Sequence, residues 1–188
     1  ASEVNKVLVD HRVDVRDSIK LREVIQESQP DFVFHLAAQA LVRPSYESPL
    51  ETIATNALGS ANLLDALRIL SKPVVAVMIT SDKAYDNIEW VWGYRETDRL
   101  GGKDPYSASK GMAELAIHTF VESFFKVPES TVRVGITRAG NVIGGGDWAL
   151  DRVVPDCVRA WSKGEKVEIR NPNATRPWQH VLEPLGGY

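Results

Sequence analysis

Apolar residues along the chain follow two different spacings that alternate with each other. Continuous apolar runs, typical of strands buried inside a parallel sheet, occur at 31–38, 74–79 and 132–139. Apolar residues at helical spacing occupy the stretches before and between these runs, at 18–27, 49–70 and 106–125. Strands separated by helices predict βαβ crossovers, so we expect an α/β fold, a doubly wound parallel sheet with helices on both faces.

The two ends of the chain carry weaker patterns. Short apolar pieces at 6–9 and 13–15 predict a strand before the first helix. Beyond the third apolar run, the sequence predicts a helix at 155–163, a further short element at 167–170 and a helix that begins near Leu182. No internal repeat and no low-complexity linker interrupts this order.

Composition narrows the classes of partner. The 188 residues are 44% hydrophobic and 25% charged, which suits a folded protein of about one domain. The net charge of −3 and the lack of basic runs give no reason to expect nucleic acid or an anionic membrane as partner. No apolar run approaches the roughly 18 residues of a membrane span. With one cysteine, Cys157, no internal disulfide can form, so we expect a cytoplasmic protein with a small-molecule partner.

Polar residues follow several of the predicted strands. The carboxyl ends of parallel strands meet at one edge of a doubly wound sheet, and ligands bind in the crevice at that edge. We therefore expect the segments after the strands to line one crevice. These segments are 14–17, 35–39, 80–83 and 138–141.

Tyr106 and Lys110 are the first candidates for chemistry within this crevice. Residues four apart lie on one face of a helix, so the ammonium group can stand beside the phenol and favour its ionised form. Such a tyrosine can act as an acid or base near neutral pH. The alternative is a surface tyrosine and lysine on an ordinary helix, and only the surrounding residues can separate the two interpretations.

A glycine-rich turn is missing from the expected place. A nucleotide-binding sheet normally begins with a strand, a glycine-rich turn and a helix whose N-terminus receives the pyrophosphate. Nothing before Lys6 can supply this turn, and the glycines at 144–146 come too late and lack the required spacing. We therefore expect the chain to be a fragment of a longer protein.

Several segments together resemble a known family. They are similar to the CDP-glucose 4,6-dehydratases of the extended short-chain dehydrogenase/reductase family, also called the NAD-dependent epimerase/dehydratase family. The resemblance implies a partial Rossmann NAD-binding domain at 1–143 and the beginning of a nucleotide-sugar-binding region at 144–188. The segments that carry it are 79–87, 92–96, 104–111, 138–148 and 176–184.

The resemblance also implies a reaction. Enzymes of this kind convert CDP-glucose to CDP-4-dehydro-6-deoxy-glucose and water with NAD as cofactor, in deoxysugar biosynthesis. By this likeness Tyr106 is the base for the C4 hydroxyl, and Lys110 holds the nicotinamide ribose. Thr80 would donate a hydrogen bond to the developing C4 oxyanion.

Asp82 and Lys83 occupy the positions that the resemblance gives to the loss of water. Once C4 is a ketone, one group must take the C5 proton and another must protonate the departing C6 hydroxyl. We assign Asp82 as the acid and Lys83 as the base, and the reverse assignment stays open. The alternative is that Lys83 only pairs with a surface carboxylate. The related dTDP-glucose dehydratases have glutamate at the position of Lys83.

The remaining site residues also come from the resemblance. Asn141, Arg152 and Arg176 are expected to bind the nucleotide sugar, since a guanidinium can make two charge-assisted bonds to a diphosphate. Trp148 is a weaker candidate near the nucleotide. The residues expected to bind the cofactor, besides Tyr106 and Lys110, are Asp14, Val15, Leu36, Ala37, Ala38, Gln39 and Asn56.

Other functions stay open at this point. A nucleotide-sugar 4-epimerase, or a dehydratase for another nucleotide, would use the same tyrosine and lysine. A non-catalytic NAD-bound scaffold would be a protein of another class. We expect a homodimer or a higher homo-oligomer that forms through the helices at 49–70 and 106–125, and the histidines show no metal-ligand spacing.

Overall fold

The structure is a computed structural model that describes residues 6–188. Contacts within the chain divide it between Arg138 and Ala139 into two compact units. The first unit holds the parallel sheet, and the second holds two short strands and two helices. The domain boundary predicted from the sequence lies after residue 143, and a nucleotide-sugar-binding region at 144–188 stays a prediction.

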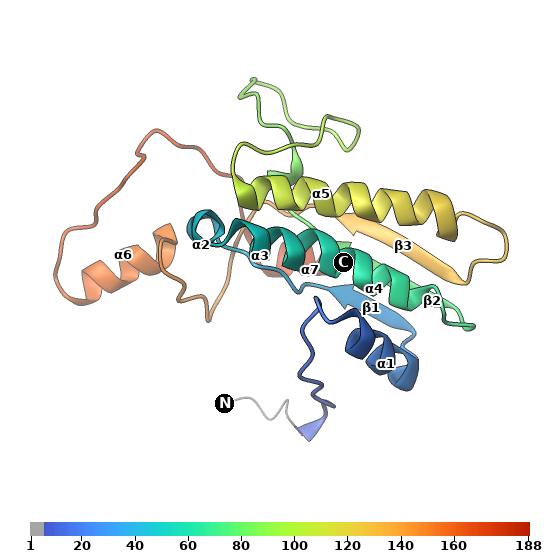
Figure 1. Ribbon diagram of the computed structural model, residues 1–188. Helices are drawn as coiled ribbons and strands as arrows, with labels where there is room; N and C mark the ends of the chain where they lie inside the picture. Colours follow the sequence, from blue (N-terminus) through green and yellow to red (C-terminus); the bar gives the residue numbers. More distant parts are fainter. Residues whose placement is uncertain (1–5) are drawn as a thin grey trace. The chain divides into compact units, whose positions relative to one another are not determined.

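The first unit is built on three parallel strands. These are β1 (Phe32–His35), β2 (Val74–Ile79) and β3 (Val132–Thr137), and β2 lies between the other two (Figure 1). Each of them lies within one of the apolar runs, so the parallel α/β sheet is confirmed. Their carboxyl ends meet at one edge, as the crossover connections require.

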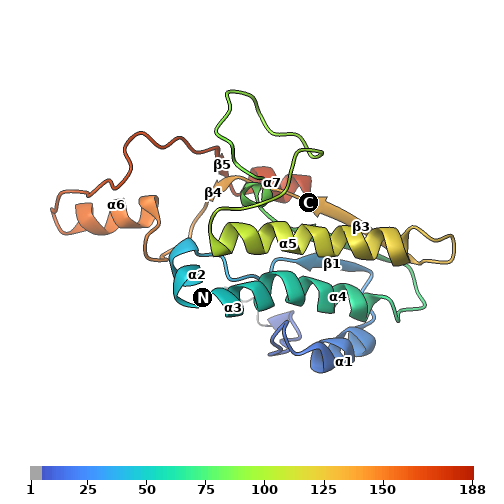
Figure 2. The same ribbon diagram turned by 45° about the horizontal axis from the view of Figure 1, so that its top comes forward.

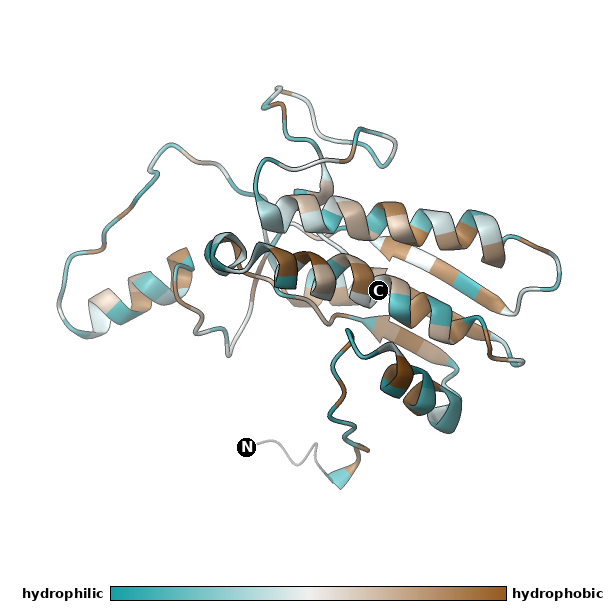
Figure 3. Cartoon of the chain, viewed as in Figure 1, coloured by the Kyte–Doolittle hydropathy of each residue, from teal (hydrophilic) through white to brown (hydrophobic). Residues whose placement is uncertain are grey.

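The two faces of the sheet differ in exposure. Ala76 and Met78 of β2 are fully buried, and Val75 on the opposite face is 40% exposed. Phe34 of β1, which is in register with Val77, is 52% exposed. The expectation that the run at 31–38 is buried on both faces is therefore wrong, because helices of the first unit cover only one of them. Figure 3 shows the apolar colouring of these strands.

The central helix begins where the sequence predicts it, but it ends at Leu67 instead of residue 70 and is less regular than its apolar stripe suggests. It begins as α3 (Pro49–Ile53), passes through a π-helical turn at Ala54–Leu58 and continues as α4 (Gly59–Leu67). A β-carbon on Gly59 would lie 2.7 Å from Cγ2 of Val15, so glycine lets the segment before the first helix pack closely here.

A second long helix lies beside the central one in both views of the ribbon (Figures 1 and 2). This helix is α5 (Pro105–Phe120), which ends in a second π-helical turn at Val121–Phe125. The predicted helix at 106–125 is thus confirmed. The apolar sides of α4 and α5 meet the buried face of the sheet, and the core includes Leu64, Leu67, Val74, Met78 and Ile117.

The first helix and two short elements complete the first unit. Helix α1 (Ser18–Ser28) packs on α4, and the short helix α2 (Val42–Glu47) packs near the start of α5. A single 3-10 turn at Asp82–Ala84 follows β2 and packs against α5. The strand predicted from 6–9 and 13–15 is not formed within the described residues, where Val7 and Val9 are each 83% exposed. A strand needs a neighbour that completes its hydrogen bonds, and none is present there.

The second unit contains a parallel pair of short strands that the sequence did not predict. These are β4 (Asn141–Ile143) and β5 (Trp178–His180), in register from Asn141 and Trp178 onward. Helices α6 (Val153–Ser162) and α7 (Leu182–Gly187) match the helices predicted at 155–163 and near Leu182. The further element expected at 167–170 is irregular backbone instead. Between residues 6 and 188, no helix is long and apolar enough to cross a membrane.

Candidate active site

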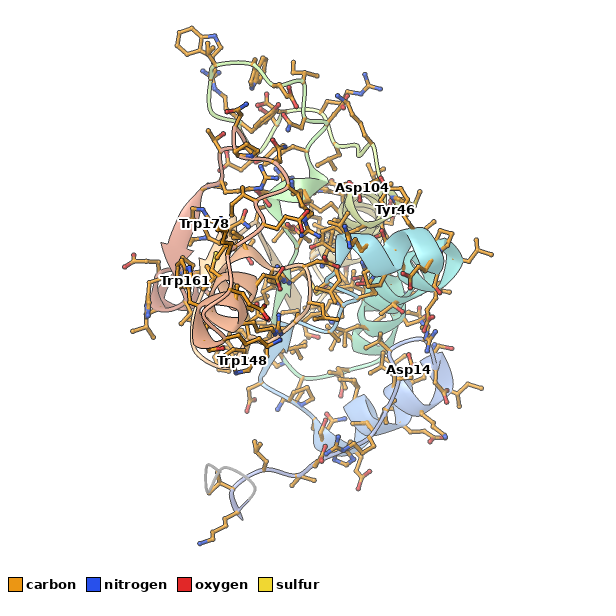
Figure 4. The ribbon with its side chains drawn as sticks, turned by 90° about the vertical axis from the view of Figure 1, so that its left-hand side faces the viewer. Asp14, Tyr46, Asp104, Trp148, Trp161 and Trp178 are labelled. Atoms are coloured by element: carbon orange, nitrogen blue, oxygen red, sulfur yellow. The ribbon has the colours of Figure 1, made fainter. Side chains whose placement is uncertain are left out.

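Tyr106 and Lys110 stand on the first two turns of α5, and both are buried. Tyr106 is 8% exposed and Lys110 is 7% exposed, which does not fit the alternative of a surface tyrosine and lysine. The start of the helix is held from two sides. Asp104 accepts a hydrogen bond from the Ser107 amide at 3.0 Å, and the buried hydroxyl of Ser45 accepts one from the Tyr106 amide at 3.1 Å. Figure 4 labels Asp104 close to Tyr46, where α2 meets α5.

The ammonium group of Lys110 is buried near a carboxylate, Glu114, and a histidine, His35. Burial lowers its pKa, and the nearby carboxylate of Glu114 opposes that shift. His35, at the end of β1, is buried close enough to be affected by the same charge. Burial, and then the Lys110 charge, lower the pKa of His35 from 6.5 to about 4. His35 is therefore neutral at neutral pH, and its Nε2 lies 3.0 Å from the hydroxyl of Ser60.

Asn56 connects the turn after β1 to α5. Its Oδ1 accepts a hydrogen bond from the Gln39 amide at 2.8 Å, and its Nδ2 donates to the Gln39 carbonyl at 3.0 Å. The same Nδ2 donates to the Ser109 hydroxyl at 2.8 Å, which in turn donates to the Tyr106 carbonyl at 2.6 Å. Asn56 is 2% exposed and lies in the π-helical turn, so these bonds fix the turn at 36–39 relative to Tyr106.

The segment after β2 presents Asp82 and Lys83 at the carboxyl end of the strand. Both are half-buried and belong to the 3-10 turn, in which the Lys83 amide donates a hydrogen bond to the Ser81 hydroxyl at 3.2 Å. The Ser81 hydroxyl also donates to Oδ1 of Asp82 at 3.0 Å. None of the carboxylates within 6–188 forms an ion pair with Lys83, so the alternative of a simple surface pair finds no support.

Thr80 does not face the site in the way that the resemblance implies. Its hydroxyl donates to Oε1 of Glu114 at 2.6 Å and lies 3.1 Å from the Thr137 carbonyl. A hydroxyl has one proton, and both of these neighbours are acceptors. The geometry therefore counts against Thr80 as a donor to a substrate oxygen. Ser81 is the neighbouring hydroxyl, and successive residues at the end of a strand point to opposite sides.

The residues expected on the adenine side of a cofactor lie before α1. Asp14 makes hydrogen bonds to the side chain and the backbone amide of Arg16, and these lower its pKa to about 2. Arg16 also reaches Glu51 at 3.1 Å. The Val15 carbonyl accepts a hydrogen bond from Asn62 at 2.9 Å. Figure 4 labels Asp14 beside α1.

The expected nicotinamide-facing turn presents mostly backbone. Leu36 is 59% exposed and Ala37 is exposed, whereas Ala38 and Gln39 are half-buried. The side chain of Gln39 folds back and donates to Thr52 at 3.0 Å. This side chain thus helps to hold the turn, and the roles of all four residues in binding the cofactor stay predictions.

The three residues expected to bind the nucleotide sugar all belong to the second unit. The Asn141 amide donates to the Pro177 carbonyl at 3.1 Å, within the β4 and β5 pair. Arg176 is exposed and donates to the Thr175 carbonyl at 2.6 Å. Nε of Arg152 is buried without a hydrogen bond and lies 3.7 Å from Asp147. Trp148 is exposed and is labelled in Figure 4 beside α6.

The first unit thus brings together four predicted catalytic residues that lie on different elements. Lys110 and Tyr106 lie on α5, Asp82 and Lys83 follow β2, and α5 packs against the turn that holds them. Sequence reasoning missed Ser45, Ser81 and Ser109. Ser81 and Ser109 adjoin predicted site residues along the chain, and no sequence pattern points to Ser45. Among residues 6–188 no cluster of potential metal ligands is found.

Comparison with known proteins identifies the family of the chain. The model of the family described as GDP-mannose 4,6 dehydratase matches residues 1–186. The chain belongs to the GDP-mannose 4,6 dehydratase family. This places it in the extended short-chain dehydrogenase/reductase family that the motifs indicated, and the Rossmann-like fold is confirmed.

Individual members of the dehydratase family and its relatives are similar over nearly the whole chain. CDP-glucose 4,6-dehydratase of Salmonella typhimurium is 53% identical over 98% of this chain and 52% of its own length. UDP-glucose 4-epimerase of Mycoplasma pneumoniae is 25% identical over 92% of this chain and 54% of its own. The chain therefore spans about half the length of the relatives that it matches.

Solved structures share the fold. UDP-glucose 4-epimerase of Thermus thermophilus in complex with NAD superimposes with a TM-score of 0.82 at 26% identity, covering 99% of this chain and 61% of that one. The dTDP-glucose 4,6-dehydratase DesIV of Streptomyces venezuelae with NAD bound gives 0.80 at 24% identity, covering 93% and 51%. A solved epimerase and a solved dehydratase thus both have the fold of this chain.

Proposed function

We propose that the complete protein to which this chain belongs is an NAD-dependent 4,6-dehydratase that converts CDP-glucose to CDP-4-dehydro-6-deoxy-glucose and water. The sequence identity of 53% to a CDP-glucose 4,6-dehydratase over 98% of the chain carries this proposal. The buried pair of Tyr106 and Lys110 beside the Asp82–Lys83 turn supports it, because an epimerase needs no acid and base for C5 and C6.

The surroundings of Lys110 suit a nicotinamide ribose. No hydrogen bond to the Lys110 ammonium group is found among residues 6–188, and the Glu114 carboxylate near it is already bonded to Thr80 and Arg138. A buried ammonium group without a hydrogen-bond acceptor is costly, and two neighbouring ribose hydroxyls would supply acceptors. When bound, NAD would supply the redox chemistry of the reaction, which is the removal of a hydride from C4 of the hexose and its return to C6. No outside oxidant is needed.

The chain's own side chains move the protons. Tyr106 takes the proton of the C4 hydroxyl, with the Lys110 charge nearby to favour its ionised form. We assign the hydrogen bond to the C4 oxygen to Ser81 instead of Thr80, because Thr80 is buried and bonded to Glu114 at 2.6 Å, whereas Ser81 is half-buried. The longer bond of 3.0 Å from Ser81 to Asp82 would be exchanged for one to the substrate oxygen. One of Asp82 and Lys83 then takes the C5 proton, and the other protonates the departing C6 hydroxyl, which leaves as water.

The cellular setting and assembly belong to the same proposal. The lack of a spanning helix within 6–188 and the family membership support a cytoplasmic location. Exposed apolar residues on the two long helices, including Leu50, Leu58 and Leu115, support a homodimer that pairs through them. Asn141, Arg152 and Arg176 are proposed to hold the nucleotide diphosphate.

The test is an assay of the complete protein with CDP-glucose, dTDP-glucose, UDP-glucose and GDP-mannose. The near-ultraviolet absorbance of 4-keto-6-deoxy sugars in alkali reports the product. We expect a signal with CDP-glucose alone and none from Tyr106→Phe. The matched control is Tyr46→Phe, a change of an exposed side chain on α2. Interconversion of C4 epimers without that absorbance would instead identify an epimerase, and a protein whose biological effect survives Tyr106→Phe would be a scaffold.

A further inference from the structure

Glu114 is a buried carboxylate that the proposed chemistry does not use. Its side chain has no exposure to solvent, and it lies one helical turn beyond Lys110 on α5. It accepts a hydrogen bond from the Thr80 hydroxyl at 2.6 Å and from Nε of Arg138 at 2.7 Å, and Nη2 of Arg138 binds its other oxygen. One carboxylate on α5 thus binds the residues that directly follow β2 and β3.

Arg138 has two further contacts. Its guanidinium lies 4.6 Å from the centre of the Tyr85 ring, and its Nη1 donates to the Glu96 carbonyl at 3.3 Å. Tyr85 follows the 3-10 turn directly, and Thr80 stands just before it. The ion pair therefore touches the chain on both sides of the turn that carries Asp82 and Lys83.

Stability alone is a weak reason for such an arrangement. Moving two charges out of water costs much of what their attraction returns, and apolar residues often fill such a place equally well. Arg138 is 11% exposed and forms a forked pair with both oxygens of Glu114, a geometry that lysine cannot copy. A forked pair fixes both distance and direction, which is useful where two catalytic elements must keep one relative position.

We propose that Glu114 and Arg138 are positioning residues that hold the Asp82–Lys83 turn in register with Tyr106 and Lys110 on α5. The turn serves the loss of water and α5 serves the oxidation at C4. The pair thus joins the elements of two successive steps. This inference rests on the proposed dehydratase function.

The test uses the complete protein and substrates deuterated at either C4 or C5. In Arg138→Met, we expect kcat to fall about 100-fold, the loss that a misplacement near 1 Å can cause, with an unchanged KM for CDP-glucose. The isotope effect of C5 deuterium on kcat should rise above that of the unmodified protein. The effect of C4 deuterium should not rise, because only the removal of the C5 proton has become slower.

Ile117→Ala is the matched control. Ile117 is fully buried on the same helix, so its truncation destabilises α5 without touching the pair. It should lower thermal stability and leave kcat per folded molecule and both isotope effects unchanged. Arg138→Lys keeps the charge without the forked pair, so it should show the same changes in the isotope effects as Arg138→Met, but smaller ones. If Arg138→Met does not fold, the isotope effects of Arg138→Lys test the proposal.

An Arg138 variant that behaves like Ile117→Ala, with neither isotope effect altered, would overturn the inference and leave the pair a structural one. Absence of turnover in the unmodified protein is a separate result, because it would overturn the proposed function itself.

Discussion

Replacing Asn56 by alanine should destabilise the protein more than any single surface change. The amide makes three hydrogen bonds at 2.8–3.0 Å while 2% exposed, two to Gln39 and one to Ser109. Each buried hydrogen bond contributes about 1 kcal/mol net, so Asn56→Ala should lower the free energy of unfolding by about 3 kcal/mol. The groups left behind are enclosed, so water cannot readily replace the lost partner.

Urea denaturation of the complete protein measures this loss. Asn62→Ala is the control, because Asn62 is half-buried and its amide makes one good bond, 2.9 Å to the Val15 carbonyl. It should cost about 1 kcal/mol. Equal losses for the two variants would refute the reasoning that the Asn56 bonds hold the turn at 36–39 to α5.

Three further outcomes are expected. Gly59→Ala should lower the melting temperature, because the new methyl overlaps Val15 at 2.7 Å and overpacking costs about 1–3 kcal/mol, and Val15→Ala should restore it in the double variant. The pKa of His35 is about 4 in the folded protein and 6.5 in the unfolded chain, so its contribution to the free energy of unfolding should be fully present above pH 6.5. As the pH falls towards 4, the free energy of unfolding should decrease by about 3 kcal/mol. The variant His35→Gln should lose less stability over this pH range in pH-dependent denaturation. Ser81→Ala should lower kcat strongly, whereas Thr80→Val should lower stability more than kcat; the reverse order in steady-state kinetics would return the site hydroxyl to Thr80.

The elements that the sequence predicted well are those with a strong local pattern. The run at 74–79 became β2 without change, and the helix at 106–125 differs only by its π-helical end. Both patterns depend on burial against a core that the first unit contains. The strand predicted before α1 failed because a strand depends on a partner elsewhere, and the spacing of valines cannot reveal whether one is present.

The sequence could predict those parts of the site whose residues lie on one helix or strand, because their spacing along the chain shows which face they share. Tyr106 and Lys110 share a helix face at any helix position, so their pairing needed no knowledge of the rest of the fold. The choice between Thr80 and Ser81 was beyond the sequence, because a shift of one residue at the end of a strand reverses the side to which each points. The bond between Glu114 and Arg138 joins residues 24 apart, and no local pattern predicts it.

The π-helical turn at Ala54–Leu58 fixes the number of residues that the central helix can contain. One residue advances an α-helix by about 100°, so the extra residue of a π turn sets α3 and α4 at different rotations about their common axis. Deleting a single residue there would make the helix more regular but the protein less stable. Asn56 would rotate away from Gln39 and lose its hydrogen bonds, while α4 kept its place in the core. Sequence change at this point should therefore proceed by substitution, with insertions and deletions confined to the loops.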